Sequence, residues 1–501
     1  MTLAPTSNLP VAIIGAGPIG LAAAAHLVSR GMALQVFEAG RHIAANLESY
    51  RHVQLFSPWT YNIDATAAAL LTKQSGWELP DGDGLPTAGQ VVEQYLLPLS
   101  RLPSIAPHLH VGARVLAVSR QGYDKVKTKG RESAAFVLRV QLASGIQEFR
   151  ASAVIDASGT WSQPSPLGGN GLPALGEPES AGRIRYGMPD IAGQERADYI
   201  GKKVLVVGSG HSAVGSLLAL AELAEQDSRT RIVWAVRGHD ISRVFGGGEA
   251  DGLPARGALG LRLRKLLDQG RLEVRKGFSV RAIHAVADQL VVEPADEGLP
   301  SIGGVDLIVG ATGARPDHSL SRELRTQHDP WLESTVQLAP LIDPNAHSCG
   351  SVRPHGHREL AHPESGFYAI GAKSYGRAPN FLMATGFEQA RSVVAALAGD
   401  FEAADAVRLE LPQTGVCSSR LPGEAAPAAG ACCGPKKDAP AAASSVTAAC
   451  CGPKTAEPSQ TPRMTAGCCG PAEAAVQEVK VSCCGSAKTT APAPTVRGCC
   501  G

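Results

Sequence analysis

The sequence lacks the features that mark membrane, secreted and nucleic-acid-binding proteins. No apolar run approaches the length needed to cross a bilayer. The first ten residues contain no lysine or arginine, and the apolar run after them reads as a strand, so we expect no signal peptide. The formal net charge is only +1 over 501 residues, which argues against a nucleic-acid partner or an anionic membrane surface. We therefore expect a cytoplasmic protein of two or three domains.

Cysteine is scarce over most of the chain. Only Cys349 and Cys417 precede residue 431, whereas the other ten of the twelve cysteines follow it as five adjacent pairs. A body with so few thiols is not a disulfide scaffold, and it indicates a reducing compartment.

What the sequence does contain begins with VAIIGAGPIG near the N-terminus. A short buried strand here runs into a glycine-rich turn and an apolar helix, and the turn contains Gly15, Gly17, Pro18 and Gly20. The first glycine permits a tight turn, the second allows a diphosphate to approach, and the third allows close packing of helix on strand. The next strand ends at Glu38, where a carboxylate can bind ribose hydroxyls. This pattern predicts a bound dinucleotide.

The segment GKKVLVVGSGHSAVG repeats the arrangement. Gly208, Gly210 and Ser212 occupy the turn, and the next strand ends at Arg237 instead of an acid. An arginine suits the additional phosphate of NADPH, so we expect NADPH here. The alternative is that Arg237 only ends a surface strand.

Two further segments are candidates for the site. The stretch RHVQLFSPWTYNID combines aromatic and polar residues, and it is either the wall of a cavity that includes Ser57 or a core-packing segment. A helix that begins near Thr385 and Gly386 is expected to direct its N-terminal dipole at a flavin. The strand containing AVIDASG and the ATG that ends at Gly313 are further buried strands with small-residue turns.

Several other segments give predictions about secondary structure or metal binding. Thr87 is a plausible N-cap of a helix that ends near Pro98. Residues 109–118 and 136–142 read as strands of a small sheet. Residues 347–362 contain four histidines and Cys349, but their spacing matches no standard zinc pattern, so active-site lining or polar surface is favoured over a metal site.

The last ninety residues form a segment rich in alanine, proline and small polar residues. We expect it to be disordered, because it has too few large apolar residues to offset its ordering entropy. It carries five Cys-Cys-Gly repeats, at Cys432–Cys433, Cys450–Cys451, Cys468–Cys469, Cys483–Cys484 and Cys499–Cys500. Paired thiolates suit soft ions such as As(III), Hg(II) or Cu(I), and repetition on a flexible chain raises their effective concentration. A redox-inert or lipidated tail remains the alternative.

Together these segments predict an α/β fold with two Rossmann-like domains, the NADPH domain inserted in the FAD domain. We expect FAD-binding parts at 8–195 and 313–411, an NADPH-binding part at 196–312, and the tail at 412–501. FAD would lie along the first glycine turn and NADPH along the second.

Residues 11–399 resemble the flavin-containing monooxygenase superfamily, in both glycine turns, in AVIDASG and in ATG. The resemblance implies reduction of FAD by NADPH, then reaction with dioxygen to a flavin hydroperoxide that oxygenates soft nucleophiles. The sequence departs from it twice. GRIRYGMPD replaces the family signature without its histidine, and Ser57 stands where many members have asparagine.

With its cysteine tail the chain also resembles flavoproteins of bacterial arsenic resistance. It is therefore interpreted as an oxidase of trivalent arsenicals, with Cys349 and Ser57 as catalytic candidates and the tail as a metalloid-binding segment. Two alternatives stay open. One is an NADPH-dependent reductase of thiols or a thiol-bound ion, although no CxxC precedes the tail. The other is a metalloid-sequestering protein.

Overall fold

The structure is a computed structural model that describes residues 8–251, 253–347 and 352–409. The chain divides into two compact units after Ala425, and every described residue belongs to the first. The described residues form two five-stranded sheets and two three-stranded sheets. Cys349, Cys417 and the five cysteine pairs lie outside them.

The first five-stranded sheet is parallel throughout, in the order β16-β7-β1-β2-β3. Its strands are β1 (Val11–Ile14), β2 (Leu34–Glu38), β3 (Leu109–Val111), β7 (Ala153–Asp156) and β16 (Phe367–Ala369). The strands come from both ends of the described chain, so this sheet is completed by a segment far from the others in sequence.

The second five-stranded sheet is also parallel, in the order β11-β10-β9-β15-β8. It contains β8 (Ile184–Tyr186), β9 (Lys203–Val207), β10 (Arg231–Ala235), β11 (Glu273–Arg275) and β15 (Leu307–Gly310). All five strands fall between β7 and β16 in the chain, which confirms the predicted α/β fold with one dinucleotide domain inserted in another. Because β8 pairs with β15, the second sheet begins before residue 196.

Each parallel sheet is covered on one face by an antiparallel sheet. One contains β4 (Arg114–Arg120), β5 (Phe136–Leu142) and β6 (Gly145–Ala151); the other contains β12 (Val280–Val286), β13 (Gln289–Pro294) and β14 (Ile302–Val305). The single strand expected over residues 109–118 is therefore wrong. β3 joins the parallel sheet and β4 the antiparallel one, and Gly112 between them has a φ of 65°.

Helices pack on the other faces, among them α1 and α10 on the first parallel sheet and α7 and α8 on the second. The α-helices of the described residues are α1 (Pro18–Ser29), α2 (Ala45–Glu48), α3 (Ala65–Ser75), α4 (Ala88–Val91), α5 (Leu97–Ser100), α6 (Arg196–Tyr199), α7 (His211–Gln226), α8 (Pro254–Asp268), α9 (Ala339–Ile342), α10 (Met383–Leu397) and α11 (Phe401–Asp405). Among the described helices, none combines the length and hydrophobicity of a membrane span.

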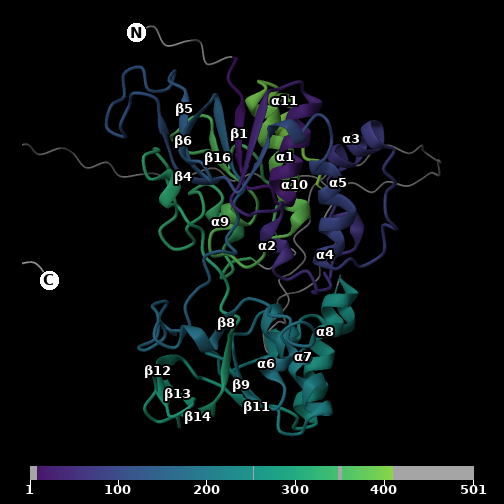
Figure 1. Cartoon of the computed structure of the whole chain (residues 1–501), viewed down its shortest axis with the longest axis vertical. Helices are drawn as coiled ribbons and strands as arrows, with labels where there is room; N and C mark the ends of the chain where they lie inside the picture. The colour runs from purple at the N-terminus through teal and green to yellow at the C-terminus, as the bar shows by residue number, and fades with distance from the viewer. Residues whose placement is uncertain (1–7, 252, 348–351, 410–501) are drawn as a thin grey trace, which may run out of the picture. The chain divides into compact units, whose positions relative to one another are not determined.

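Alternation along the central strands divides the core into layers. Side chains of successive strand residues point to opposite faces of the sheet. In β9, Val204 and Val206 pack with α7 and α8, whereas Leu205 and Val207 pack with β12–β14. Figure 1 shows α7 and α8 on one side of β9 and β12–β14 on the other. The same alternation in β1 places it between α1 and α10 on one face and β4–β6 on the other.

The predicted N-cap at Thr87 and the predicted helix end near Pro98 are both confirmed. Thr87 and Gln90 form a reciprocal capping box at the start of α4. A π-helical stretch, Val92–Leu96, comes next, and α5 then contains Pro98 within its first turn. The helical segment therefore runs without interruption from Ala88 to Ser100 and ends two residues after Pro98.

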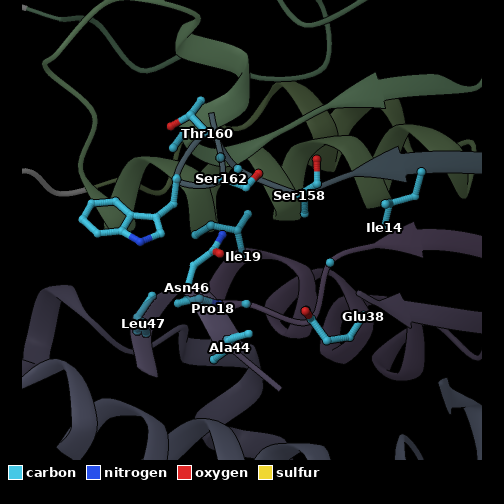
Figure 2. A pocket seen from close by; sticks show the side chains of 18 of the residues that line it. Ile14, Pro18, Ile19, Glu38, Ala44, Asn46, Leu47, Ser158, Thr160 and Ser162 are labelled. Atoms are coloured by element: carbon cyan, nitrogen blue, oxygen red, sulfur yellow. The ribbon is translucent and has the colours of Figure 1, made fainter. Parts of the chain in front are cut away.

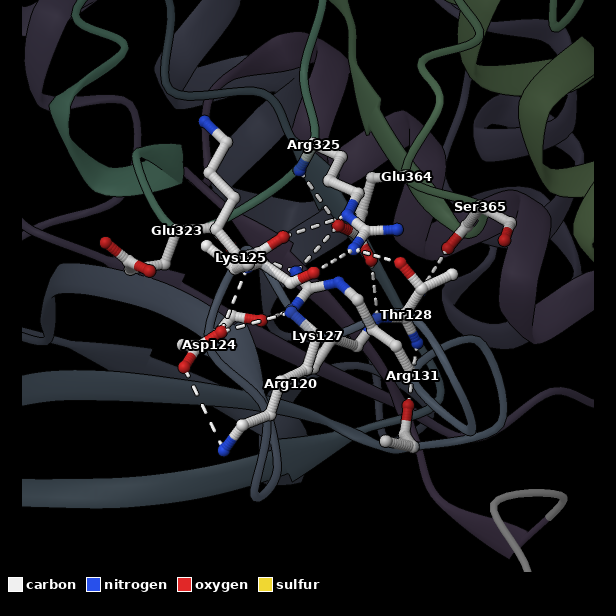
Figure 3. A network of polar contacts seen from close by, with 12 residues as sticks. Arg120, Asp124, Lys125, Lys127, Thr128, Arg131, Glu323, Arg325, Glu364 and Ser365 are labelled. Carbon is white, nitrogen blue, oxygen red and sulfur yellow. Dashed lines mark hydrogen bonds and ion pairs between the residues drawn. The ribbon is translucent and has the colours of Figure 1, made fainter.

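A buried charge cluster joins β4 to the loop before β16. The Glu364 carboxylate accepts hydrogen bonds from Arg120 Nε and Arg131 Nη2, each at 2.8 Å, and from the Arg325 backbone N–H at 2.9 Å. The side chains of both ion-pair arginines and of Glu364 are at most 3% exposed. Figure 3 shows the two guanidinium groups converging on this carboxylate.

We predict that Glu364→Gln lowers the free energy of unfolding by about 3–5 kcal/mol, because it leaves two buried guanidinium groups without a counter-charge. Urea denaturation measures the loss. The control is Glu148→Gln, since the Arg139–Glu148 pair is 65% and 55% exposed. An exposed pair contributes about 1 kcal/mol at most. Equal losses in the two variants would contradict the assigned role of Glu364.

Three imidazole rings form a row near β16. The ring centroids of His318 and His328 are 3.9 Å apart, and those of His328 and His362 are 5.0 Å apart. Burial, followed by the neighbouring imidazoles, lowers the pKa of His328 to about 3. Burial also lowers the pKa of His362 to about 4 and, with the charge of Lys373, that of His318. All three rings are therefore neutral in the folded protein at pH 7.

These neutral histidines should make the fold acid-sensitive. Below about pH 6.5 the unfolded chain binds protons that the folded chain does not, so the free energy of unfolding falls as the pH drops toward 4. His362→Phe should make this fall shallower, and His52→Gln, at an exposed site, should not. Urea midpoints at pH 7.5, 6 and 5 provide the measurement. Parallel pH dependences for wild type and His362→Phe would refute the prediction.

Candidate functional site

The first glycine turn has the geometry that its spacing predicts. Gly15 has a φ of 98°, and a Cβ there would lie 2.8 Å from the Ala157 carbonyl oxygen. A Cβ on Gly20 would lie 2.0 Å from the Gly15 carbonyl oxygen, whereas one on Gly17 would meet no atom within 4 Å. The first and third glycines are therefore required by packing, and the second faces open space.

The N-terminus of α1 is available to an anion. Gly17 is its N-cap, no side chain caps it, and Pro18 stands at its first position. Uncapped N–H groups and the helix dipole together favour a phosphate at this place.

Glu38 ends β2 beside the same turn. Its carboxylate accepts hydrogen bonds from the backbone N–H groups of Ala16, at 2.8 Å, and Gly40, at 2.7 Å. The side chain is fixed in this way, and each oxygen keeps a lone pair for a further donor such as a ribose hydroxyl.

A cavity of about 660 Å³ opens in front of the turn. Its walls comprise the glycine turn, Glu38–Gly40, residues 113–116, residues 157–162 and residues 381–383. Figure 2 shows Pro18, Asn46 and Ser158 around this space, each from a different segment. The volume falls in the range of cofactor sites.

Ser57 lies in the cavity wall, together with Leu55, Phe56 and Asn62, so the aromatic and polar stretch does line a cavity. The Ser57 hydroxyl donates to Asn62 Oδ1 at 3.0 Å, and the Asn62 amide donates back to the Ser57 carbonyl at 2.7 Å. Asn62 is 1% exposed and holds the loop together. Asn46 also lines the cavity.

The helix predicted to begin near Thr385 and Gly386 is α10, and its contact with the cavity lies a few residues earlier in the chain. α10 begins at Met383, and Phe381, Leu382 and Met383 are the wall residues of this segment. Thr385 and Gly386 lie in its first turn and are not among the cavity-lining residues. A Cβ on Gly386 would lie 2.6 Å from Ile19 Cδ1, so this glycine allows α10 to pack against α1.

The second glycine turn repeats the geometry of the first. Gly208 has a φ of 134°, and a Cβ there would lie 2.1 Å from the Ala311 carbonyl oxygen. Gly210 is the N-cap of α7 with open space beside it, and no side chain caps the helix. His211 and Ser212 form the first turn of α7. This helix end can therefore also bind an anion.

Three further residues border this turn. Arg237 is exposed beyond β10 and donates one N–H to the Gly169 carbonyl at 3.3 Å, so its other N–H donors are available. His211 packs against Phe56 of the cavity wall, with ring centroids 5.3 Å apart. Gly313 lies in the segment that leaves β15, and its carbonyl accepts a hydrogen bond from Ser165 N–H at 2.8 Å, away from the described cavity wall.

The described histidines of residues 347–362 have separate hydrogen-bond partners. His347 contacts the Pro340 carbonyl, His355 contacts the Arg353 carbonyl and Gln389, and His357 pairs with Asp405. Within residues 8–251, 253–347 and 352–409, no three metal-ligating side chains come together.

Sequence reasoning missed Asn46, Ser158 and Asp317, which line the cavity. Asn46 and Asp317 belong to no recognisable motif. Ser158 belongs to AVIDASG, whose pattern indicates only a strand with a small-residue turn.

Comparisons with known proteins agree with this architecture. A family model described as an NAD(P)-binding Rossmann-like domain matches residues 13–78. A ferredoxin–NADP reductase of Gluconacetobacter diazotrophicus is 28% identical over 248 residues, which are 49% of this chain and 57% of that protein. The chain thus matches little more than half of this relative.

Solved structures match over most of the described chain. Bacillithiol disulfide reductase of Bacillus cereus has a TM-score of 0.57 at 18% identity, covering 78% of this chain and 99% of that one. The FAD-bound cadaverine monooxygenase of Erwinia amylovora has a TM-score of 0.55 at 15% identity, covering 82% and 99%. The ornithine N-hydroxylase of Kutzneria sp. 744 has a TM-score of 0.52 at 13% identity, covering 79% and 100%. The chain has the fold of the FAD- and NAD(P)-binding oxidoreductase superfamily, with both of its dinucleotide turns in place.

Proposed function

We propose that the chain is an FAD-dependent, NADPH-using monooxygenase that oxidises a soft nucleophile such as a trivalent arsenical. The observation that carries this proposal is the cavity of about 660 Å³ at the first glycine turn, bordered by an uncapped helix end and an anchored ribose-binding acid. FAD fits these features, with its diphosphate at Gly17 and a ribose at Glu38. When bound, FAD accepts a hydride from NADPH and passes electrons to dioxygen.

The second turn suits NADPH. Its diphosphate would lie at Gly210 and Ser212, and the free donors of Arg237 would meet the ribose phosphate. His211 has a pKa lowered by burial and by the charge of Arg256, so it is neutral at pH 7. Its contact with Phe56 places the second turn beside the wall of the FAD cavity.

A monooxygenase is favoured over a dithiol reductase by the cysteine pattern. No CxxC or CxxxxC precedes the tail, and the described cavity wall contains no thiol. Ser57, Asn46 and Arg114 are among the polar side chains of the described cavity wall that would orient a small oxyanion or hydroxide substrate.

Trivalent arsenic has the lone pair that electrophilic oxygen transfer requires. The balance is arsenite, dioxygen, NADPH and a proton giving arsenate, NADP⁺ and water. The five cysteine pairs, with Cys349, would bind the soft trivalent form and release the pentavalent product. Repeated pairs would raise the substrate concentration near the cavity.

Gly17→Ala should leave the fold intact and weaken FAD binding about tenfold or more. Its Cβ meets no protein atom within 4 Å and would occupy the space in which the diphosphate approaches. The FAD dissociation constant, read from flavin fluorescence, is the measurement. Gly182→Ala, at an exposed position with equally open space, is the matched control. An unchanged FAD dissociation constant in Gly17→Ala would show that the FAD diphosphate does not bind at this turn.

The substrate is tested by NADPH oxidation with arsenite or methylarsenite, in air and without it. We expect arsenical-dependent NADPH oxidation that produces As(V) and stops without oxygen. A rate that persists without oxygen would indicate the reductase alternative, and a rate insensitive to both arsenicals would refute the proposed substrate.

A chain ending at Gly415 should keep turnover at higher substrate concentration. Loss of cellular protection with no turnover in either chain would indicate a sequestering protein.

A further inference from the structure

The proposed chemistry leaves a buried ammonium group without a role. Lys373 lies in the short helix Gly371–Tyr375 after β16 and is 2% exposed. Its Nζ lies 2.6 Å from Asp156 Oδ2 at the end of β7, and it donates to Ser158 Oγ at 3.1 Å. Ser158 in turn donates its backbone N–H and hydroxyl to Asp156 Oδ1, at 3.1 and 2.6 Å. The three side chains form a closed ring of charge-assisted hydrogen bonds.

This ring lies directly behind the first glycine turn. Ser158 lines the cavity, and its Cα would lie 3.1 Å from a Cβ on Gly15. The uncapped N-terminus of α1 lies on the other side of the same turn. The helix end therefore borders the place where the diphosphate of a dinucleotide would lie, and the ammonium group lies behind that turn without lining the described cavity itself.

The charge of Lys373 also acts on two neighbouring residues. Burial lowers the pKa of His318, which is not among the lining residues of the described cavity, and the charge of Lys373 lowers it further. Next to it, Asp317 lines the cavity. Burial raises the pKa of Asp317, but hydrogen bonds from Ser319 and the charge of Lys373 bring it below its ordinary value.

We propose that Lys373 is a positioning residue for the FAD diphosphate, on which it acts through the positive charge that it places behind the glycine turn. This inference rests on the proposed function, because it requires FAD in the described cavity. Asp156 fixes the ammonium group and weakens its attraction for the cofactor at the same time.

Charge-changing variants of the pair separate this role from a purely structural one. Lys373→Met removes the cation and leaves Asp156 unpaired, so FAD should bind about tenfold or more weakly. Asp156→Asn keeps an acceptor for the ammonium but removes the counter-charge, so FAD should bind more tightly than in wild type. The double variant, Asp156→Asn with Lys373→Met, should fall between the two. FAD dissociation constants of the full-length apoprotein, measured at low and high salt, provide the readout.

Glu364→Gln is the matched control, because it removes a buried carboxylate from an ion-pair cluster outside the described cavity wall. It should lower stability and leave FAD affinity unchanged. A purely structural role of Lys373 predicts that Asp156→Asn also weakens FAD binding, and that result would overturn the inference. If Lys373→Met does not fold, the change in the FAD dissociation constant of Asp156→Asn alone distinguishes the two roles of Lys373: tighter binding supports a positioning role, and weaker binding supports a purely structural one. A wild-type chain that binds no FAD would instead refute the proposed function.

Discussion

The close approach of backbones at the first glycine turn is the constraint on which the rest of the structure depends. The β1–α1 turn lies so close to the end of β7 that a Cβ on Gly15 would meet the Ala157 carbonyl, and within the turn itself a Cβ on Gly20 would meet the Gly15 carbonyl. This contact brings an uncapped helix end, Glu38 and Ser158 to one edge of the sheet. In open parallel sheets, the carboxyl ends of strands are where ligands bind. The second turn applies the same constraint at Gly208 and Ala311.

The two parallel sheets are built by the same rule and differ in the charged residue at the end of the second strand of each dinucleotide unit. In the first, Glu38 is fixed by two backbone N–H groups; in the second, Arg237 remains largely free on the surface. An acid fixed in the wall suits a permanently bound nucleotide. A cation with free N–H donors at the surface suits a nucleotide that binds and dissociates in each catalytic cycle. This difference supports the assignment of FAD to the first sheet and NADPH to the second.

The sequence predicted the features that local patterns determine: both glycine turns, their flanking strands, Glu38 and the capped start at Thr87. Prediction from the sequence failed where packing between segments far apart in the chain determines the structure. Residues 109–118 read as one strand, but they divide at Gly112 between one parallel sheet, which contains β3, and one antiparallel sheet, which contains β4. Asn46 and Asp317 reach the cavity only through tertiary packing, so no local motif reveals them.

The pairing of β16 with β7 has a consequence for how the protein is made. Their ends are joined by the Lys373–Asp156 contact, across 217 residues of sequence. All strands of the second sheet lie between them, so a ribosome completes that sheet before β16 has been synthesised. The nascent first sheet meanwhile exposes the edge of β7, which is a template for incorrect strand pairing. Productive folding therefore depends on protecting this edge during translation until the last strand arrives.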